Sequence, residues 1–261
     1  MDYKLEGKLA FVTGSSKGIG KATAMLLVRE GAEVIVHGRT PESVEAARKD
    51  LPTAHAVHGD LEDKAAVERI IGEIKDIGIV DILVNNAGIY DAKPFADIPD
   101  EDWLRFFEVN VMSGVRFSRA FLPEMLLKNW GRIVFISSES AINTPAEMIH
   151  YGMTKTAQLS VSRGLAELTK GTGVTVNAVL PGPTASEGVT GFMESMAKSR
   201  GQTVKAAEEE FFRTVRPTSL LQRFEDPAEV AQAIVFVASP LSSAINGAAL
   251  RADGGTVKSV F

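Results

Sequence analysis

Short apolar runs rich in valine and isoleucine alternate along this chain with longer segments of helical periodicity. Such alternation predicts repeated strand, helix and strand units, which build a parallel sheet covered by helices on both faces. The apolar runs lack a regular polar alternation, as is typical of strands buried on both sides. We predict strands at Leu9–Thr13, Glu33–His37, Ala54–His58, Ile79–Val84, Gly131–Ser137, Val174–Leu180 and Ala248–Ala252. Helices are predicted at Gly18–Glu30, Pro41–Asp50, Asp63–Ile77, Asp100–Asn129, Glu147–Lys170 and Pro227–Ala238.

The 261 residues contain no visible linker or internal repeat, so we predict one α/β domain over residues 1–261 with a doubly wound, mainly parallel, seven-stranded sheet. Residues 186–223 interrupt the alternation. This segment mixes apolar residues with many charges, and we interpret it as a helical lid over the substrate. A packing or oligomer-contact subdomain fits the same pattern. The apolar residues in question are Phe192, Met193, Met196, Phe211 and Phe212.

For two of the predicted helices the sequence also predicts a break or a buried face. Pro123 lies inside Asp100–Asn129, so this helix should be kinked there or consist of two helices. In Glu147–Lys170 a stripe of apolar residues follows a helical period and is expected to face the core. The stripe consists of Met153, Ala157, Val161, Leu165 and Leu168.

The composition excludes several classes of function. The formal charge of −5 without a cluster of lysine or arginine argues against nucleic acid or an anionic membrane as a partner. No apolar run reaches the length of a membrane span or a signal core. The absence of cysteine excludes disulfides, thiolate ligands and a cysteine nucleophile, and fits a cytoplasmic protein. The four histidines form no ligand pattern, so no metal site is predicted.

A glycine-rich turn follows the first predicted strand and leads directly into a helix. Its glycines, Gly14, Gly18 and Gly20, are spaced Gly-x-x-x-Gly-x-Gly. Glycines at this turn let the backbone approach a pyrophosphate, whose charge is met by free N–H groups at the positive end of the helix. The first strand-to-helix turn is also where dinucleotide-binding folds hold the pyrophosphate.

The end of the second predicted strand distinguishes between the two nicotinamide dinucleotides. A carboxylate at this position binds the ribose 2′-hydroxyl of NAD, whereas an arginine accommodates the 2′-phosphate of NADP. The chain has Arg39 here, and Lys17 in the glycine turn adds a second cation. We therefore favour NADP(H), with a bidentate contact to Arg39. NAD(H) remains the alternative, with both cations as solvated surface charges.

Tyr151 and Lys155 are four residues apart in a predicted helix, and residues at this spacing share a face with Cβ atoms about 5–6 Å apart. A nearby ammonium group should lower the phenol pKa, which suits general acid–base catalysis. Ser138 follows the fifth predicted strand, at the sheet edge where open α/β sheets bind ligands.

These motifs together resemble the short-chain dehydrogenase/reductase family. The order is the glycine turn, Asn85-Asn86-Ala87-Gly88 after the fourth strand, Asn110, Ser138 and Tyr151-x-x-x-Lys155, and the resemblance extends from about Leu5 to Gly255. It implies a Rossmann-type fold, a dinucleotide cofactor and a homo-oligomer, either a tetramer or a dimer. It also implies that a small carbonyl or alcohol compound is the substrate.

The resemblance also implies roles for individual residues. Tyr151 would be the general acid in reduction and the base in oxidation. Ser138 would bind the substrate oxygen, Lys155 the nicotinamide ribose, and Asn110 would support a water-linked proton relay. The implied cofactor residues are Gly14, Ser16, Lys17, Gly18, Ile19, Gly20, Arg39, Asp60, Leu61, Asn86, Ala87, Gly88, Tyr151, Lys155, Pro181, Gly182, Thr184 and Ser186.

The resulting hypothesis is an NADP(H)-dependent oxidoreductase that interconverts a ketone or aldehyde and an alcohol. Two alternatives remain open from the sequence. The first is an NAD-dependent alcohol or sugar dehydrogenase of the same family. The second is a non-catalytic protein that senses a dinucleotide, because a fold alone does not dictate function.

Overall fold

A computed structural model describes residues 2–260 and contains one seven-stranded sheet in which every neighbouring pair of strands is parallel. The strand order is β3-β2-β1-β4-β5-β6-β7, which confirms the predicted doubly wound architecture. The chain crosses from one half of the sheet to the other between β3 and β4, so β1 and β4 are neighbours at the point where the order reverses. The strands are β1 (Leu9–Val12), β2 (Glu33–Gly38), β3 (His55–His58), β4 (Ile82–Asn85), β5 (Gly131–Ile136), β6 (Val174–Pro181) and β7 (Ala249–Ala252).

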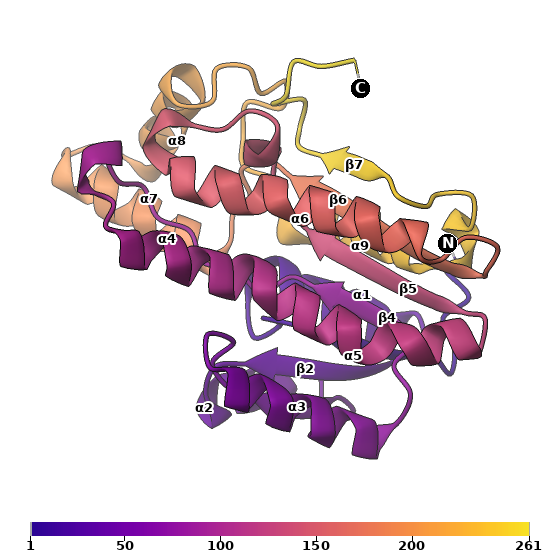
Figure 1. Cartoon of the computed structure of the whole chain (residues 1–261). Coiled ribbons are helices and arrows are strands. Elements are labelled where there is room, and N and C mark those ends of the chain that lie inside the picture. The colour runs from indigo at the N-terminus through magenta and orange to yellow at the C-terminus, as the bar shows by residue number, and fades with distance from the viewer. Residues whose placement is uncertain (1, 261) are drawn as a thin grey trace.

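Helices cover both faces of this sheet (Figure 1). On one face α1 and α9 pack against each other and against the strands; on the other, α3, α5 and α6 cover the sheet. Successive strand residues point to opposite layers, so Val12 joins the first core and Phe11 joins the second. The helices are α1 (Gly18–Arg29), α2 (Pro41–Arg48), α3 (Lys64–Ile77), α4 (Asp100–Phe107), α5 (Ser113–Leu127), α6 (Ile149–Glu167), α7 (Glu187–Ser199), α8 (Val204–Thr214) and α9 (Pro227–Ala238).

Two helices, α2 and α9, begin with a capping residue followed by a proline. The Thr40 side chain accepts a hydrogen bond from the backbone N–H of Ser43 at the start of α2. Asp226 caps α9, and the side chain of Glu229 accepts from the Asp226 N–H in return. Both helices have proline at the first helical position, where its missing N–H is not needed.

The predicted helix over residues 100–129 is divided, but the division lies away from Pro123. A π-helical turn at Glu108–Met112 separates α4 from α5, while Pro123 lies within α5. A π turn leaves an irregular backbone that requires other hydrogen-bond partners. Gln158 of α6 supplies one of them, because its Nε2 donates to the carbonyl of Asn110 at 2.6 Å.

The predicted core stripe of α6 is wrong in part. The stripe residues are only half-buried, and Leu168 is 63% exposed. The adjacent, more polar face is the more deeply buried one, and it includes Thr154, Lys155 and Gln158. Apolar periodicity predicted the wrong face because the polar side chains find hydrogen-bond partners inside the molecule.

Helices α7 and α8 lie beyond the carboxyl ends of the strands (Figure 1). They form a small apolar cluster of their own around Met193, Ala197 and Ala207, and Phe212 is buried against Phe224. Phe192 is instead 62% exposed. Among residues 2–260, no helix has both the length and the apolarity needed to cross a lipid bilayer.

Candidate active site

The glycine turn after β1 has the backbone shape that the sequence predicts. Gly14 and Gly18 adopt φ values of +62° and +55°, which side chains with a Cβ atom rarely allow. A Cβ atom on Gly20 would lie 2.4 Å from the Asn86 side chain and 2.5 Å from the Gly14 carbonyl. The turn therefore packs backbone against backbone at the first turn of α1, and Ser16 and Ile19 are half-buried beside it.

His37 binds the backbone of this turn, a role that the sequence analysis did not predict. Its Nδ1 accepts the Gly14 N–H at 3.0 Å, so its Nε2 carries the proton and donates to the Gly59 carbonyl at 3.0 Å. Burial lowers the His37 pKa to about 4, so the ring stays neutral at physiological pH. The signal in the sequence was a histidine in an otherwise apolar strand.

Thr13 and Asn86 connect the turn to the end of β4. The Thr13 hydroxyl accepts hydrogen bonds from the N–H groups of Asn86 and Ala87, both at 2.9 Å. The Asn86 side chain donates to the carbonyls of Thr13 and Gly14. Because β1 and β4 are neighbours where the strand order reverses, these bonds close one end of the crevice in which open α/β sheets bind ligands.

Three predicted cofactor residues lie at the ends of β2 and β3. Arg39 follows β2 with an exposed side chain, and Lys17 is exposed in the glycine turn. Asp60 is exposed after β3, whereas Leu61 is buried. These positions lie at the carboxyl ends of β2 and β3, and binding of the adenosine half of a dinucleotide there stays a prediction.

Tyr151, Ser138 and Lys155 meet at the carboxyl end of β5. The Ser138 hydroxyl lies close enough to the Tyr151 phenol to lower its pKa, and the Lys155 Nζ lies 5.5 Å from the centre of the Tyr151 ring. Ser138 also accepts the Ser140 N–H at 3.1 Å, which fixes the short 3₁₀ turn after the strand. The predicted catalytic residues are thus brought together by β5 and the first turns of α6.

Asn110 and Gly88 complete this cluster. The Asn110 Oδ1 accepts the Ile89 N–H at 2.7 Å, and its Nδ2 donates to the Ile89 carbonyl and to Thr154. A Cβ atom on Gly88 would lie 3.3 Å from Asn110 Oδ1 and 3.4 Å from Lys155 Nζ. The glycine therefore keeps the loop after β4 close to the lysine, and the π turn aims Asn110 inward.

The pKa values in the cluster follow burial more than the attraction between Tyr151 and Lys155. Burial raises the pKa of Tyr151 to about 12, and the nearby Ser138 hydroxyl opposes this rise. Burial also lowers the pKa of Lys155 to about 7, while its Nζ donates to the Ile136 carbonyl at 2.8 Å. The expected lowering of the phenol pKa is thus wrong for this structure, because desolvation is the largest influence on the phenol and burial also shifts Lys155 toward its uncharged form.

The segment after β6 reaches back to the glycine turn. Pro181 ends β6, and the Thr184 hydroxyl donates to the Gly182 carbonyl at 3.0 Å. Ser186 caps α7, and a Cβ atom on Gly18 would lie 3.2 Å from its side chain. The segment after β6 therefore lies against the start of α1, and cofactor binding by these residues stays a prediction.

One acidic side chain already contacts an N–H group of the glycine turn, and its position indicates whether the turn can bind an anion. Glu187, in the first turn of α7, accepts the Gly18 N–H at 2.8 Å, so its carboxylate lies at the start of α1. A carboxylate there resembles a phosphate oxygen in charge and in its need for N–H donors. The N–H groups of the turn thus fit the pyrophosphate of a dinucleotide. The first turn of α7 lies against the Gly18 N–H, which is one of these groups.

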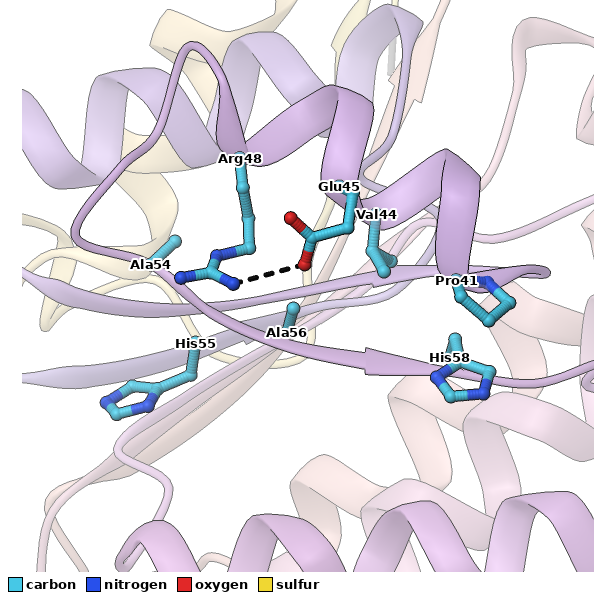
Figure 2. Close-up of a pocket in the computed structure, with 8 residues that line it drawn as sticks. All are labelled: Pro41, Val44, Glu45, Arg48, Ala54, His55, Ala56 and His58. Carbon is cyan, nitrogen blue, oxygen red and sulfur yellow. Dashed lines mark hydrogen bonds and ion pairs between the residues drawn. The ribbon is translucent and has the colours of Figure 1, made fainter.

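Two hollows on the surface differ in their relation to the crevice at the glycine turn. The first, with a volume of about 460 Å³, lies between α1 and α7 and is lined by Gly18 and Glu187 among others. Another of about 420 Å³ lies at the outer edge of the sheet between α2 and β3, where Arg48 pairs with Glu45 (Figure 2). The second contains none of the predicted site residues. In the described part of the chain, no group of three histidine, cysteine or acidic side chains could hold a metal ion.

The chain is similar to proteins of one enzyme family. The model of the short chain dehydrogenase family matches residues 8–203. The uncharacterized oxidoreductase YvrD of Bacillus subtilis is 50% identical over 263 residues, with all of both chains covered. L-sorbose reductase from Gluconobacter frateurii, solved with NADPH and L-sorbose, is 28% identical with a TM-score of 0.94, again over 100% of both chains.

A second solved structure has a different named substrate. The 3-oxoacyl (acyl-carrier-protein) reductase from Agrobacterium tumefaciens, with NADP bound, is 30% identical and has a TM-score of 0.87. The match covers 97% of this chain and 96% of that one. Overall likeness therefore does not decide the substrate.

Proposed function

Because this chain belongs to the short chain dehydrogenase family, we propose that it interconverts a ketone or aldehyde and an alcohol, with NADP(H) as cofactor and Tyr151 as acid and base. Membership of the family makes the chain an NAD(P)-dependent oxidoreductase. The observation that carries the finer proposal is the meeting of Ser138, Tyr151 and Lys155 beside the crevice that the glycine turn closes.

The chain's own residues would position the carbonyl group and protonate it. Ser138 donates a hydrogen bond to the carbonyl oxygen and fixes it beside the phenol. Bound NADPH supplies the hydride to the carbonyl carbon. Tyr151 gives its proton to the oxygen as negative charge develops there. In the oxidative direction the same groups act in reverse order.

The raised pKa of the phenol suits the reductive direction. A Tyr151 pKa of about 12 keeps the phenol protonated at neutral pH, so a proton is always available. An alkoxide is a stronger base than a phenolate, so the transfer still runs downhill. Lys155, with a pKa of about 7, changes its charge close to neutral pH beside this group.

Replacement of Tyr151 by phenylalanine tests the mechanism. General acid–base groups contribute about 10²- to 10⁴-fold, so kcat for NADPH-dependent carbonyl reduction should fall by that factor. NADPH binding, measured by fluorescence titration, should remain. Tyr3→Phe is the matched control, because this phenol donates to Gln232 at 2.9 Å and lies outside the crevice. Turnover by Tyr151→Phe at the parent's rate would exclude Tyr151 as the acid.

The preference for NADP(H) is supported by the charges at the end of β2. Arg39 directly follows this strand, Lys17 adds a second positive charge, and both side chains are exposed. The residues from Gly38 to Pro41 include no carboxylate that could bind the 2′-hydroxyl of NAD. A guanidinium can instead donate two parallel hydrogen bonds to a phosphate.

Arg39→Ala tests this preference. Loss of a charge-assisted contact should lower kcat/KM with NADPH by about 10- to 100-fold and leave the value with NADH within about threefold. Arg48→Ala is the control, since Arg48 pairs with Glu45 at 3.1 Å in the outer hollow. A parent that prefers NADH, or equal losses in both variants, would favour the NAD-dependent alternative.

A further inference from the structure

Glu139 is a buried carboxylate beside the catalytic serine. It directly follows Ser138 in the 3₁₀ turn after β5 and is only 3% exposed. Its Oε1 accepts a hydrogen bond from Arg216, whereas its Oε2 is buried and has no hydrogen-bond partner of normal geometry. Burial raises the pKa of this carboxyl, and the nearby Arg216 and Ser140 oppose the rise. A buried carboxylate oxygen without a donor is costly, which points to a missing donor at this position.

Arg216 reaches this carboxylate from the end of the segment that contains α7 and α8. Its Nε lies 3.0 Å from Glu139 Oε1, and its Nη1 lies 3.6 Å from Glu147 Oε1. The guanidinium side chain is 11% exposed. Glu139 and Arg216 are both close enough to Tyr151 to change its pKa, in opposite directions. The Glu139 carboxylate therefore lies near the Tyr151 phenol.

An aromatic side chain lies against the Tyr151 phenol. The Tyr90 ring meets the Tyr151 ring edge-on, with centroids 6.5 Å apart. The Tyr90 hydroxyl lies against α7, because a Cβ atom on Gly188 would be 2.7 Å from it. The Tyr151 phenol thus has the Tyr90 ring against it and the buried Glu139 carboxylate nearby.

From these contacts we propose that Glu139 selects a neutral, polyhydroxylated ketone by accepting a hydrogen bond from a substrate hydroxyl at its free Oε2. The inference rests on the proposed function, since Ser138 and Tyr151 must hold the carbonyl group. Arg216 binds the other oxygen and thereby aims the carboxylate. The ring of Tyr90 supplies an apolar surface for the carbon chain.

The charges explain why the substrate is neutral. Arg216 carries one positive charge and contacts two carboxylates, those of Glu139 and Glu147, so this group has a net negative charge when all three are ionised. A substrate carboxylate would meet repulsion from Glu139 and an arginine whose charge is already matched. A hydroxyl group provides the donor that the free oxygen lacks.

Three six-carbon ketones test the proposal with purified full-length enzyme and NADPH. L-sorbose is neutral and polyhydroxylated, 5-keto-D-gluconate adds a carboxylate, and 2-hexanone has no hydroxyl group. The parent should reduce L-sorbose with a kcat/KM at least about tenfold above those of the other two. Glu139→Gln should lower the ratio of L-sorbose to 2-hexanone by about 10- to 100-fold, mainly through KM.

Glu147→Gln is the matched control, because Glu147 contacts the same guanidinium but its side chain is 47% exposed. Its ratio should stay within threefold of the parent's. Glu139→Asp keeps the charge on a shorter side chain and provides a second variant if Glu139→Gln fails to fold. It should preserve the discrimination against 5-keto-D-gluconate while raising KM for L-sorbose.

The outcomes separate this inference from the proposed function. A parent that reduces 2-hexanone but prefers it to L-sorbose, or that prefers 5-keto-D-gluconate, overturns the role of Glu139 and leaves carbonyl reduction intact. An unchanged ratio in Glu139→Gln overturns it as well. A parent that reduces none of the three ketones but reduces another ketone or an aldehyde overturns this inference alone, whereas a parent that reduces no carbonyl compound with NADPH contradicts both proposals.

Discussion

Replacement of Lys155 by methionine should change how the stability of the ligand-free protein depends on pH. Lys155 is 4% exposed, its Nζ donates to the Ile136 carbonyl, and burial lowers its pKa from 10.5 to about 7. Between these two values the unfolded chain holds a proton that the folded protein lacks. Unfolding therefore takes up a proton, and the free energy of unfolding rises as pH increases through this window.

The size of the effect follows from the separation of the two pKa values. The penalty for burying the ammonium is fully present below about pH 7 and absent above pH 10.5. At about 1.4 kcal/mol per pKa unit, this separation sets a ceiling of about 5 kcal/mol, with up to about 3 kcal/mol of it between pH 7 and pH 9. The Lys155→Met variant lacks this ammonium group, so its free energy of unfolding should not show this rise with pH.

Urea unfolding of the parent and the variant at pH 7, 8 and 9, followed by circular dichroism, measures the difference. The stability of the parent relative to Lys155→Met should rise steadily over this range. Lys64→Met is the control, because Lys64 is 74% exposed on α3 and should keep the parent's profile. Parallel profiles for the parent and Lys155→Met would refute the lowered pKa.

Two further predictions concern the glycine turn. Glu187→Gln removes the carboxylate that accepts the Gly18 N–H, so NADPH should bind about fivefold more tightly in a fluorescence titration, the equivalent of about 1 kcal/mol; unchanged affinity would show that Glu187 does not compete. Gly20→Ala places a Cβ atom 2.4 Å from Asn86, and this overpacking should cost about 1–3 kcal/mol in thermal unfolding and weaken NADPH binding. Gly72→Ala, with open space in α3, should be neutral or stabilising by up to about 1 kcal/mol, and equal effects of the two alanines would contradict the packing argument.

Local patterns were sufficient for the parts of the fold that depend on short-range rules. Proline after a capping residue marked the start of α2 and α9, and apolar runs marked the strands. These signals work because capping and strand burial are decided within a few residues. The sequence also determined the parallel sheet, since strands alternating with helices have few other arrangements.

Sequence patterns gave wrong predictions where a distant segment supplied the hydrogen-bond partner. The buried face of α6 is polar because Asn110, from the π turn, accepts from Gln158, and no periodicity within α6 contains that information. The division between α4 and α5 likewise occurs at the π turn and not at Pro123. Hydrogen-bond satisfaction between segments overrode the local preference in both places.

The candidate site shows the same division between local and distant determinants. The glycine turn, Ser138, Tyr151 and Lys155 could be recognised from the order of their motifs and from the family resemblance that these motifs carry together, because each belongs to a strand end or to one helical face. The contact between Glu139 and Arg216 could not be predicted from the sequence. These residues are 77 positions apart and meet only after α7 and α8 fold over the strand ends. The sequence by itself thus determined which chemistry the site contains. Only the tertiary structure decided which charges surround it, because electrostatic interactions and burial depend on distances in space.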